Sequence, residues 1–520
     1  MARLRCDIRP ASQIPPEPCS TASFVDENKS TAIQFLSSKL RFAVPLRHED
    51  PDGESITLVG RMVYAQCCPG TPLIDWEDQI RMASGMPDQL GPLRDRPILL
   101  YLCGGPGADN PFDRVPDLNR CLLRLGYQIL YMDYRGCGES DPVSQKSLEA
   151  KGLKADQAKA DYLKLFGQVD IVRDLEAVRL CLAQKLYSAG RRPEPDGLRW
   201  TILGQSYGGY ISLTYLSVYP EGLQEVFITG GLPPCGMLID DYFRIKHGKL
   251  VKETQRYFSV YPDDDRLLRE VLMLIASIGP ENIRMTGRGY MTEQKLLSLG
   301  RQFGSRSGFD EVHSLLCRIK SELGTDGQLK PETIRLFEST LHMDERPLYA
   351  LLLEQTWCSG GATRWSAERI WRDLEGYEYL QKDAQGRYRD PASFPVDQPI
   401  YFTSHVFGEF TYDTHEELLD LKGVADILHN YEWECPYDYD RLAKNRVPVY
   451  ALSFASDMHL DISVARKTAH MVGNLYFEMD DMHWHQALRH IPVTIMCWLF
   501  EMKKYAEERR LREPQEEEGR

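Results

Sequence analysis

The stretch Trp200-Thr-Ile-Leu-Gly-Gln-Ser-Tyr-Gly-Gly209 predicts more about this chain than any other. Its first four residues suit a strand buried on both faces, and the residues from Tyr210 to Tyr219 can continue as a helix. Between them lies a GxSxG motif centred on Ser206. Small residues on both sides of the serine allow a sharp turn that projects its hydroxyl at the edge of a sheet. Because GxSxG occurs by chance in roughly one of every five chains this long, the rest of the sequence must support it.

Other short apolar runs also end in glycine-containing loops. These runs are Pro97–Leu102 before Gly104-Gly-Pro-Gly107, Tyr127–Met132 before Asp133-Tyr-Arg-Gly-Cys-Gly138, and Val226–Thr229 before Gly230-Gly231. Helical patterns such as 169–186 lie between them. This alternation predicts an α/β fold around a mostly parallel sheet. Upstream, residues 40–44 and 55–65 alternate apolar and polar around the turn Asp50-Pro-Asp-Gly53, which predicts an antiparallel hairpin.

The pattern changes between Cys235 and Lys444, where it is mostly helical, as at 266–278 and 342–357. A helical insertion of roughly 200 residues in an α/β sheet predicts a cap over the active site. Buried strands are expected again at 448–454 and 474–479, before a helix at 492–507. The predicted units are a loosely held N-terminal segment (1–30), the first part of the core (31–234), the cap (235–444), the second part of the core (445–507) and a charged tail (508–520).

Composition excludes several classes of protein. The chain has 520 residues and a formal net charge of −14, with no basic stripe, so nucleic acid is not an expected partner. Its hydrophobic fraction of 42% is enough for a large core. No apolar run resembles a secretory signal or a membrane span, so we expect a cytosolic protein without a membrane partner. The spacing of cysteines and histidines predicts no metal site, and the oligomeric state stays open.

Ser206 is the predicted nucleophile of an acyl-transfer reaction. The negative oxygen formed by its attack needs fixed backbone N–H donors, each worth roughly 3–4 kcal/mol. One donor is expected from Tyr207, and another from the loop after an early strand, where Gly104 and Gly105 lie. This order of strands, loops and nucleophile predicts the α/β-hydrolase fold.

The acid and the base should follow Ser206 in the chain, each after a late strand. Asp457 and Asp461 both follow the strand predicted at 448–454, and Asp457 is favoured because it lies nearer the strand end. The base is one of three histidines, His483, His485 or His490, and position alone does not separate the first two. Such a triad forms a covalent acyl-enzyme that water then hydrolyses. No metal or organic cofactor is needed for this chemistry.

The motifs together resemble the proline iminopeptidase family, also called prolyl aminopeptidases, and its larger fungal and bacterial branch in particular. The resemblance runs from about Lys39 to Arg489. It is carried by Cys103-Gly-Gly-Pro-Gly107, Asp133-Tyr-Arg-Gly-Cys-Gly-Glu-Ser140, Gly204-Gln-Ser-Tyr-Gly-Gly209, Gln355-Thr-Trp-Cys-Ser-Gly360, Arg364-Trp-Ser-Ala-Glu-Arg369, Phe407-Gly-Glu409, Asp457-Met-His-Leu-Asp461 and His485-Gln-Ala-Leu-Arg489. It implies a serine peptidase that releases N-terminal proline, or a similar small residue, from small peptides.

The resemblance also implies particular residues. His485 fits the family pattern HxGLR, with Ala487 in place of the glycine, and Asp457 is supported as the acid. Glu354 and Glu409 match acidic positions that bind the substrate amine. Cys103 and Tyr134 depart from the residues that are usual in the family, at positions that can alter the substrate pocket. An apolar slot for the proline ring is expected from nearby aromatic residues such as Trp357, Trp365, Tyr401 and Phe407.

Two other functions fit the same sequence. A related hydrolase could use this triad on an ester, lactone or amide, including one of secondary metabolism. A scaffold kept only for binding would also preserve the fold. Carboxylates that converge near Ser206 would favour the aminopeptidase, and reaction with a serine-directed probe would exclude the binding scaffold.

Overall fold

The computed structural model describes residues 4–14, 21–24, 35–65, 96–188, 197–341, 343–404 and 408–512. Several ranges discussed above lie outside this part: 1–3, 15–20 and 25–30 of the N-terminal segment, 31–34, 66–95 and 189–196 of the first core part, 342 and 405–407 (with Phe407) of the cap, and 513–520 of the tail. None of the helices in the described part is long and apolar enough to cross a membrane.

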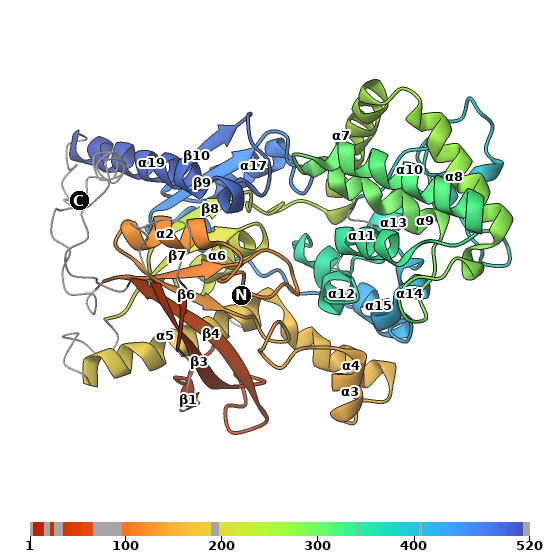
Figure 1. Cartoon of the computed structure of the whole chain (residues 1–520). Coiled ribbons are helices and arrows are strands. Elements are labelled where there is room, and N and C mark those ends of the chain that lie inside the picture. Colours follow the sequence, from red (N-terminus) through yellow and green to blue (C-terminus); the bar gives the residue numbers. More distant parts are fainter. Residues whose placement is uncertain are drawn as a thin grey trace.

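A ten-stranded sheet forms the centre of one half of the molecule (Figure 1). The strands are β1 (Ser12–Ile14), β2 (Thr21–Phe24), β3 (Phe35–Pro45), β4 (Ser55–Ala65), β5 (Ile98–Leu102), β6 (Gln128–Met132), β7 (Trp200–Gln205), β8 (Leu223–Thr229), β9 (Val449–Phe454) and β10 (Leu475–Asp480). Their order is β1-β3-β4-β6-β5-β7-β8-β9-β10, with β2 on β3. All pairs from β6 to β10 are parallel, whereas β3 and β4 form the predicted antiparallel hairpin. The predicted α/β architecture is therefore confirmed.

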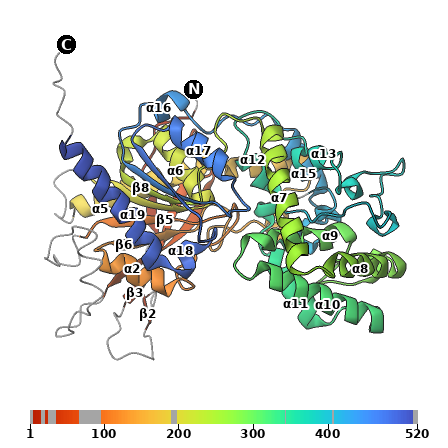
Figure 2. The same ribbon diagram turned by 90° about the horizontal axis from the view of Figure 1, so that it is seen from above.

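Helices cover both faces of the sheet (Figure 2). One group packs together on one face: α2 (Pro116–Arg124), α18 (Ala487–His490) and α19 (Pro492–Arg512). The other face carries α5 (Gln168–Ser188), α6 (Tyr207–Val218), α16 (Tyr439–Ala443) and α17 (Ile462–Met471). β5 and β7 are buried along their whole length because each has a strand on either side and helices above and below.

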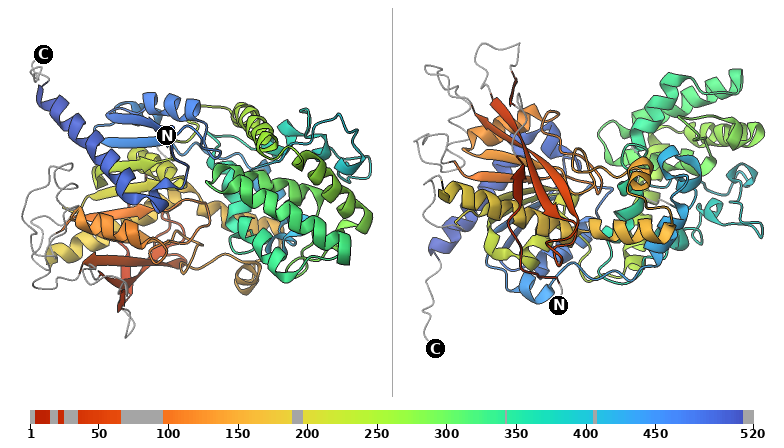
Figure 3. Two further views of the ribbon diagram at one scale, coloured as in Figure 1. Left: turned by 45° about the horizontal axis from the view of Figure 1, so that its top comes forward. Right: turned by 90° about the horizontal axis from the view of Figure 1, so that it is seen from below.

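The chain between β8 and β9 forms a helical body beside the sheet (Figures 1 and 2). Its helices, apart from α16, are α7 (Ile239–Val260), α8 (Asp264–Ile278), α9 (Glu293–Leu297), α10 (Gly308–Asp326), α11 (Pro331–Leu341), α12 (Pro347–Thr356), α13 (Ser366–Trp371), α14 (Thr411–Thr414) and α15 (Lys422–Asn430). We call this body the cap. The core also reaches it through α3 (Gln145–Ala150) and α4 (Asp156–Leu163), since α4 packs against α15 (Figure 3).

Three expected elements differ from the structure. The helix predicted at 342–357 begins only at Pro347, because a residue before proline disfavours helical backbone and Arg346 is not helical. The sequence predicts that β10 is fully buried, but the strand is partly exposed. It is the last strand of the sheet, and its Glu478 and Met479 are exposed. The final helix continues to Arg512 instead of ending at Glu507, since the charged residues that follow are good helix formers.

Candidate functional site

Ser206 lies at the turn between β7 and α6, as the motif predicts. Its φ is +55°, which is uncommon for a residue other than glycine and marks a strained turn. Its backbone N–H donates to the carbonyl of Thr229 at 3.0 Å, and its own carbonyl accepts from Gly209 at 2.8 Å. A Cβ atom on Gly208 would lie only 2.1 Å from the Leu102 carbonyl oxygen. Glycine is therefore required here because α6 packs directly on the end of β5.

The glycine loop after β5 lies beside this serine. A Cβ atom on Gly104 would come within 3.2 Å of the Ser206 Cβ and 3.6 Å of its Oγ. Behind the loop, the hydroxyl of Tyr134 donates to the Cys103 carbonyl at 3.0 Å, and both residues are buried. The two residues that depart from the family pattern therefore support the backbone of this loop.

Asp457 and His485 form a buried hydrogen-bonded pair. The Nδ1 atom of His485 lies 2.6 Å from Oδ2 of Asp457, and the other carboxylate oxygen accepts from the backbone N–H of His459 at 2.7 Å. Arg489, four residues after His485, donates to the side chain of Gln205 at 2.8 Å. This bond ties the histidine loop to the residue that precedes Ser206. The structure thus brings the serine, the histidine loop and the Asp457 loop to one edge of the sheet.

The residues that the sequence left as alternatives have other contacts. Asp461 accepts from the N–H of Ser463 and caps the N-terminus of α17. His483 pairs with Asp480 at 2.7 Å, and His490 is exposed at the end of α18. Hydrogen-bond geometry therefore pairs His485 with Asp457, whereas position along the chain could not separate His485 from His483.

The two glutamates assigned by resemblance lie in the cap with a third acidic residue. Glu354, at the end of α12, is buried and accepts from the N–H of Ser366 at 2.5 Å. Burial raises its pKa to about 8, although the backbone N–H groups of Ser366 and Ala367 oppose the shift. Glu368, which we did not single out from the sequence, lies close enough to raise this pKa further.

Glu409 has a different environment. It forms ion pairs with Lys382 at 2.8 Å and Lys422 at 3.0 Å. Burial alone would raise its pKa, but the two lysines outweigh burial and hold the pKa below its ordinary value. Its backbone N–H also donates to Glu368 at 2.8 Å. Glu354, Glu368 and Glu409 therefore form one acidic cluster, in which only Glu409 is neutralised by two lysines.

Comparison with known proteins agrees with the topology. Residues 97–249 match the family model described as alpha/beta hydrolase fold. Together with the parallel sheet and the turn at Ser206, this match decides the fold. The chain has the α/β-hydrolase fold.

Similarity to individual proteins covers nearly the whole hydrolase. This chain is 28% identical over 475 residues to the proline iminopeptidase AneH of Aspergillus aculeatus, and the match covers 90% of this chain and 94% of that protein. It is 28% identical over 452 residues to the proline iminopeptidase of Aeromonas sobria, covering 86% and 92%. The crystal structure of a proline iminopeptidase of Mycobacterium smegmatis covers 90% of this chain and 99% of its own, with a TM-score of 0.40 and 13% identity.

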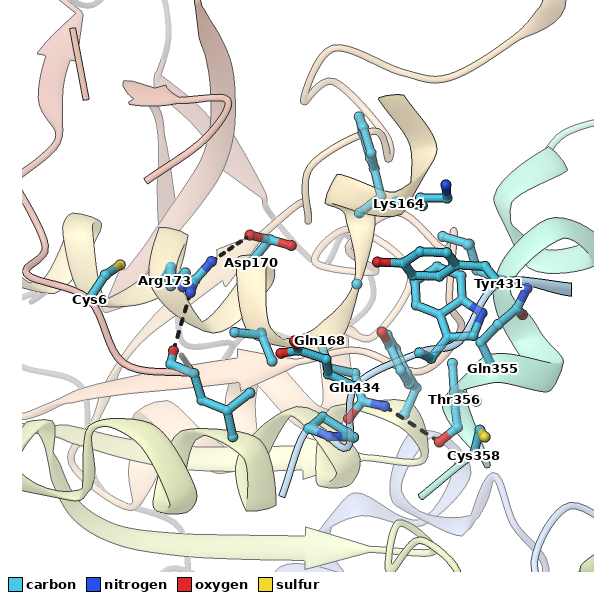
Figure 4. Close-up of a pocket in the computed structure, with 18 of the residues that line it drawn as sticks. Cys6, Lys164, Gln168, Asp170, Arg173, Gln355, Thr356, Cys358, Tyr431 and Glu434 are labelled. Carbon is cyan, nitrogen blue, oxygen red and sulfur yellow. Dashed lines mark hydrogen bonds and ion pairs between the residues drawn. The ribbon is translucent and has the colours of Figure 1, made fainter. Parts of the chain in front are cut away.

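Two hollows lie beside the candidate site residues. One, of about 570 Å³, lies between α5, the N-terminal residues 4–6 and the cap, and the side chain of Tyr207 lines it. Figure 4 shows Gln355 and Tyr431 at one end of it and Arg173 with Asp170 at the other. Arg173 pairs with Asp170 at 3.1 Å and with Glu49 at 2.6 Å. The second hollow, of about 490 Å³, is lined by His459 and Gln486, next to the histidine loop.

The close approach of Gly104 to Ser206 leads to a prediction. Gly104→Ala is expected to lower kcat by roughly 100-fold, because the new methyl group crowds Ser206 and displaces the nearby backbone N–H donors. The melting temperature should change little, since Gly104 does not have a positive φ. Steady-state kinetics and a thermal melt of the same preparation test this. An unchanged kcat would mean that this loop does not contact the reacting group.

Proposed function

We propose that this hydrolase is a serine exopeptidase that releases N-terminal proline, or a similar small residue, from peptides. The observation that carries the proposal is the hydrogen-bonded pair of Asp457 and His485 on the edge of the sheet that also holds Ser206. The order Ser, Asp, His is that of hydrolases with this fold. The similarity to two proline iminopeptidases includes the cap, which supports the choice of substrate.

In the proposed reaction, Asp457 keeps the proton of His485 on Nδ1, so that Nε2 can accept a proton. His485 then removes the proton of Ser206 as its Oγ attacks the carbonyl carbon of the N-terminal residue. The backbone N–H groups of Tyr207 and of the Gly104–Gly105 loop stabilise the negative oxygen. His485 passes its proton to the leaving amine, and water later releases the acyl group from Ser206.

Glu354 is the proposed partner of the substrate's ammonium group. A carboxylate in a dry site attracts an ammonium strongly, which confines cleavage to the N-terminal residue. With a pKa of about 8, Glu354 is largely protonated at neutral pH, and a bound ammonium would favour its ionised form. Glu409 would have to exchange a lysine for the substrate, so we assign it the lesser role.

Glu354→Gln should therefore raise KM for free-amine substrates by roughly 10- to 100-fold and leave N-blocked substrates unaffected, because the loss of a charged hydrogen bond costs binding. In the wild type, KM for proline p-nitroanilide should fall between pH 7 and pH 8.5, as Glu354 ionises while the substrate amine is still protonated. This dependence should disappear in Glu354→Gln. Glu375→Gln, at an exposed position of the cap, is the matched control. An equal rise in KM for free and blocked substrates would remove Glu354 from amine binding.

A substrate panel tests the proposed activity directly. The proline, alanine and leucine p-nitroanilides are compared with short acyl esters, and we expect the proline compound to react fastest. Cleavage of esters alone would favour the related ester, lactone or amide hydrolase. A cytosolic location is proposed with the activity, because every cysteine in the described part of the chain is a free thiol, as in reducing compartments.

A further inference from the structure

His459 stands on one side of the proposed triad. Its ring stacks on the ring of His485, with centroids 4.2 Å apart and an angle of 22° between the planes. His459 and Gln486 line the second hollow described above, which we call the histidine-side hollow. Its opposite wall comes from the cap and includes Arg301, Gln302 and Thr340. Because the triad histidine hands its proton to the leaving group, the departing part of the substrate must lie on this side of the site.

The cap presents positive charge to this region. Lys246 of α7 is only 5% exposed, and its Nζ atom has no hydrogen-bond partner among the residues that the structure describes. It lies 4.2 Å from the centre of the Trp357 ring. Buried charges in proteins are normally paired, so an ammonium held in this way favours an anion nearby.

The pKa shifts of Lys246 and His459 agree with a positive electrostatic field on this side of the proposed triad. Burial lowers the pKa of Lys246 to about 7, with Lys249 and Arg301 adding to the effect and Asp457 opposing it. Burial also lowers the pKa of His459 well below its ordinary value, and His485, Arg301, Lys246 and Lys249 lower it further. His459 is therefore neutral at pH 7, and the cations of the cap act on the loop that carries it.

Two acidic side chains also line the histidine-side hollow. Asp310 and Glu311 line the same hollow but are exposed, and they accept hydrogen bonds from Tyr261 and Ser307. Arg301 is less exposed than these two residues, and its guanidinium lies 5.0 Å from the centre of the Tyr349 ring on α12. The hollow therefore presents carboxylates at exposed positions and a guanidinium at a half-buried one.

We infer that the histidine-side hollow binds the free C-terminal carboxylate of the leaving portion, with Arg301 as its partner, so that the preferred substrates are dipeptides and other very short peptides. This inference rests on the proposed exopeptidase function and specifies its substrate class. The planar guanidinium can bind a carboxylate through two parallel hydrogen bonds. A carboxylate here would join Asp457 as a second negative charge near the Lys246 ammonium, whose Nζ atom has no hydrogen-bond partner among the described residues.

The test compares prolyl-alanine, prolyl-alanine amide and proline p-nitroanilide as substrates. In the wild type, kcat/KM for the dipeptide should exceed that for its amide by roughly 10-fold or more, the worth of a charged hydrogen bond. Arg301→Gln should reduce this ratio to about one and change p-nitroanilide hydrolysis by less than about threefold. Arg266→Gln, an exposed arginine on α8, is the matched control and should keep the wild-type ratio.

Lys246→Met gives a second, independent measurement. In this variant the ratio of kcat/KM for prolyl-alanine to kcat/KM for its amide should fall. The melting temperature should stay unchanged or rise, because a buried amine without a hydrogen-bond partner is removed. If Arg301→Gln lowers the melting temperature, Arg301→Lys should restore the charge and at least part of the ratio. A loss in Arg301→Lys as large as in Arg301→Gln would assign Arg301 a structural role and overturn the inference.

Failure of the inference is distinct from failure of the proposed function. A wild-type ratio near one with rapid p-nitroanilide cleavage would overturn the carboxylate site alone. An unchanged ratio in Arg301→Gln would do the same. If the wild type cleaved neither the dipeptide nor the p-nitroanilide, the exopeptidase proposal itself would fall, and the carboxylate site with it.

Discussion

Ser206→Ala is expected to lower kcat for proline p-nitroanilide by roughly 10⁴- to 10⁶-fold and to abolish labelling by a fluorophosphonate probe. The reason is that Ser206 is the residue at the strained turn after β7, and alanine has no hydroxyl with which to form an acyl-enzyme. The fold should persist, because alanine removes one partly exposed oxygen and leaves the backbone hydrogen bonds to Thr229 and Gly209 in place.

Ser277→Ala is the matched control for this experiment. Ser277 is exposed on α8 in the cap, and its loss should leave both labelling and hydrolysis at the wild-type level. The melting temperatures of the three proteins should agree within about 3 °C. If the wild type neither labelled nor hydrolysed any substrate of the panel, the serine mechanism would be wrong and a binding scaffold would become the better interpretation.

Asp457→Asn is expected to lower kcat by roughly 10⁴-fold and to change KM little. The neutral amide no longer holds the Nδ1 proton of His485 or stabilises the imidazolium that forms during attack. Asparagine can still accept from the backbone N–H of His459 through its carbonyl oxygen, so the loop should keep its conformation. Kinetics at saturating proline p-nitroanilide, with a thermal melt as a check on folding, measure the effect.

Asp461→Asn is the matched control for Asp457→Asn, because Asp461 is the alternative acid that the sequence alone allows. Its carboxylate caps α17, and asparagine caps a helix about as well. The variant should therefore keep kcat within about threefold and have nearly the wild-type melting temperature. A large loss in Asp461→Asn with a small one in Asp457→Asn would reverse the assignment of the acid.

Local sequence patterns were sufficient for most of the sheet. The apolar runs that became β5, β6, β7 and β8 are buried on both faces, so hydrophobicity alone marks them. β10 was the exception. Its apolar run suggested full burial, but an edge strand has a neighbour on one side only, and exposure at an edge depends on strand order, which no local pattern encodes.

Helix boundaries in the cap were harder to predict. An apolar pattern continues through 342–357, yet the helix begins at Pro347, where proline chemistry overrides the pattern. The sequence predicted only two of the three glutamates of the acidic cluster. Glu354 and Glu409 match family positions, whereas Glu368 belongs to the cluster only because the cap folds these segments together.

The turn at Ser206 was determined by the sequence itself. Strand, glycine, serine, glycine and helix follow one another within about a dozen residues, and their local conformational preferences suffice to place the hydroxyl. The tertiary structure decided the partners. The sequence favours Asp457 over Asp461 as the acid, but only the direction of each side chain in the folded loop pairs Asp457 with His485 and leaves Asp461 to cap α17. The histidine-side hollow likewise joins cap and core residues more than 150 positions apart, such as Arg301 and His459, and packing between distant segments is the physical reason that no local pattern reveals it.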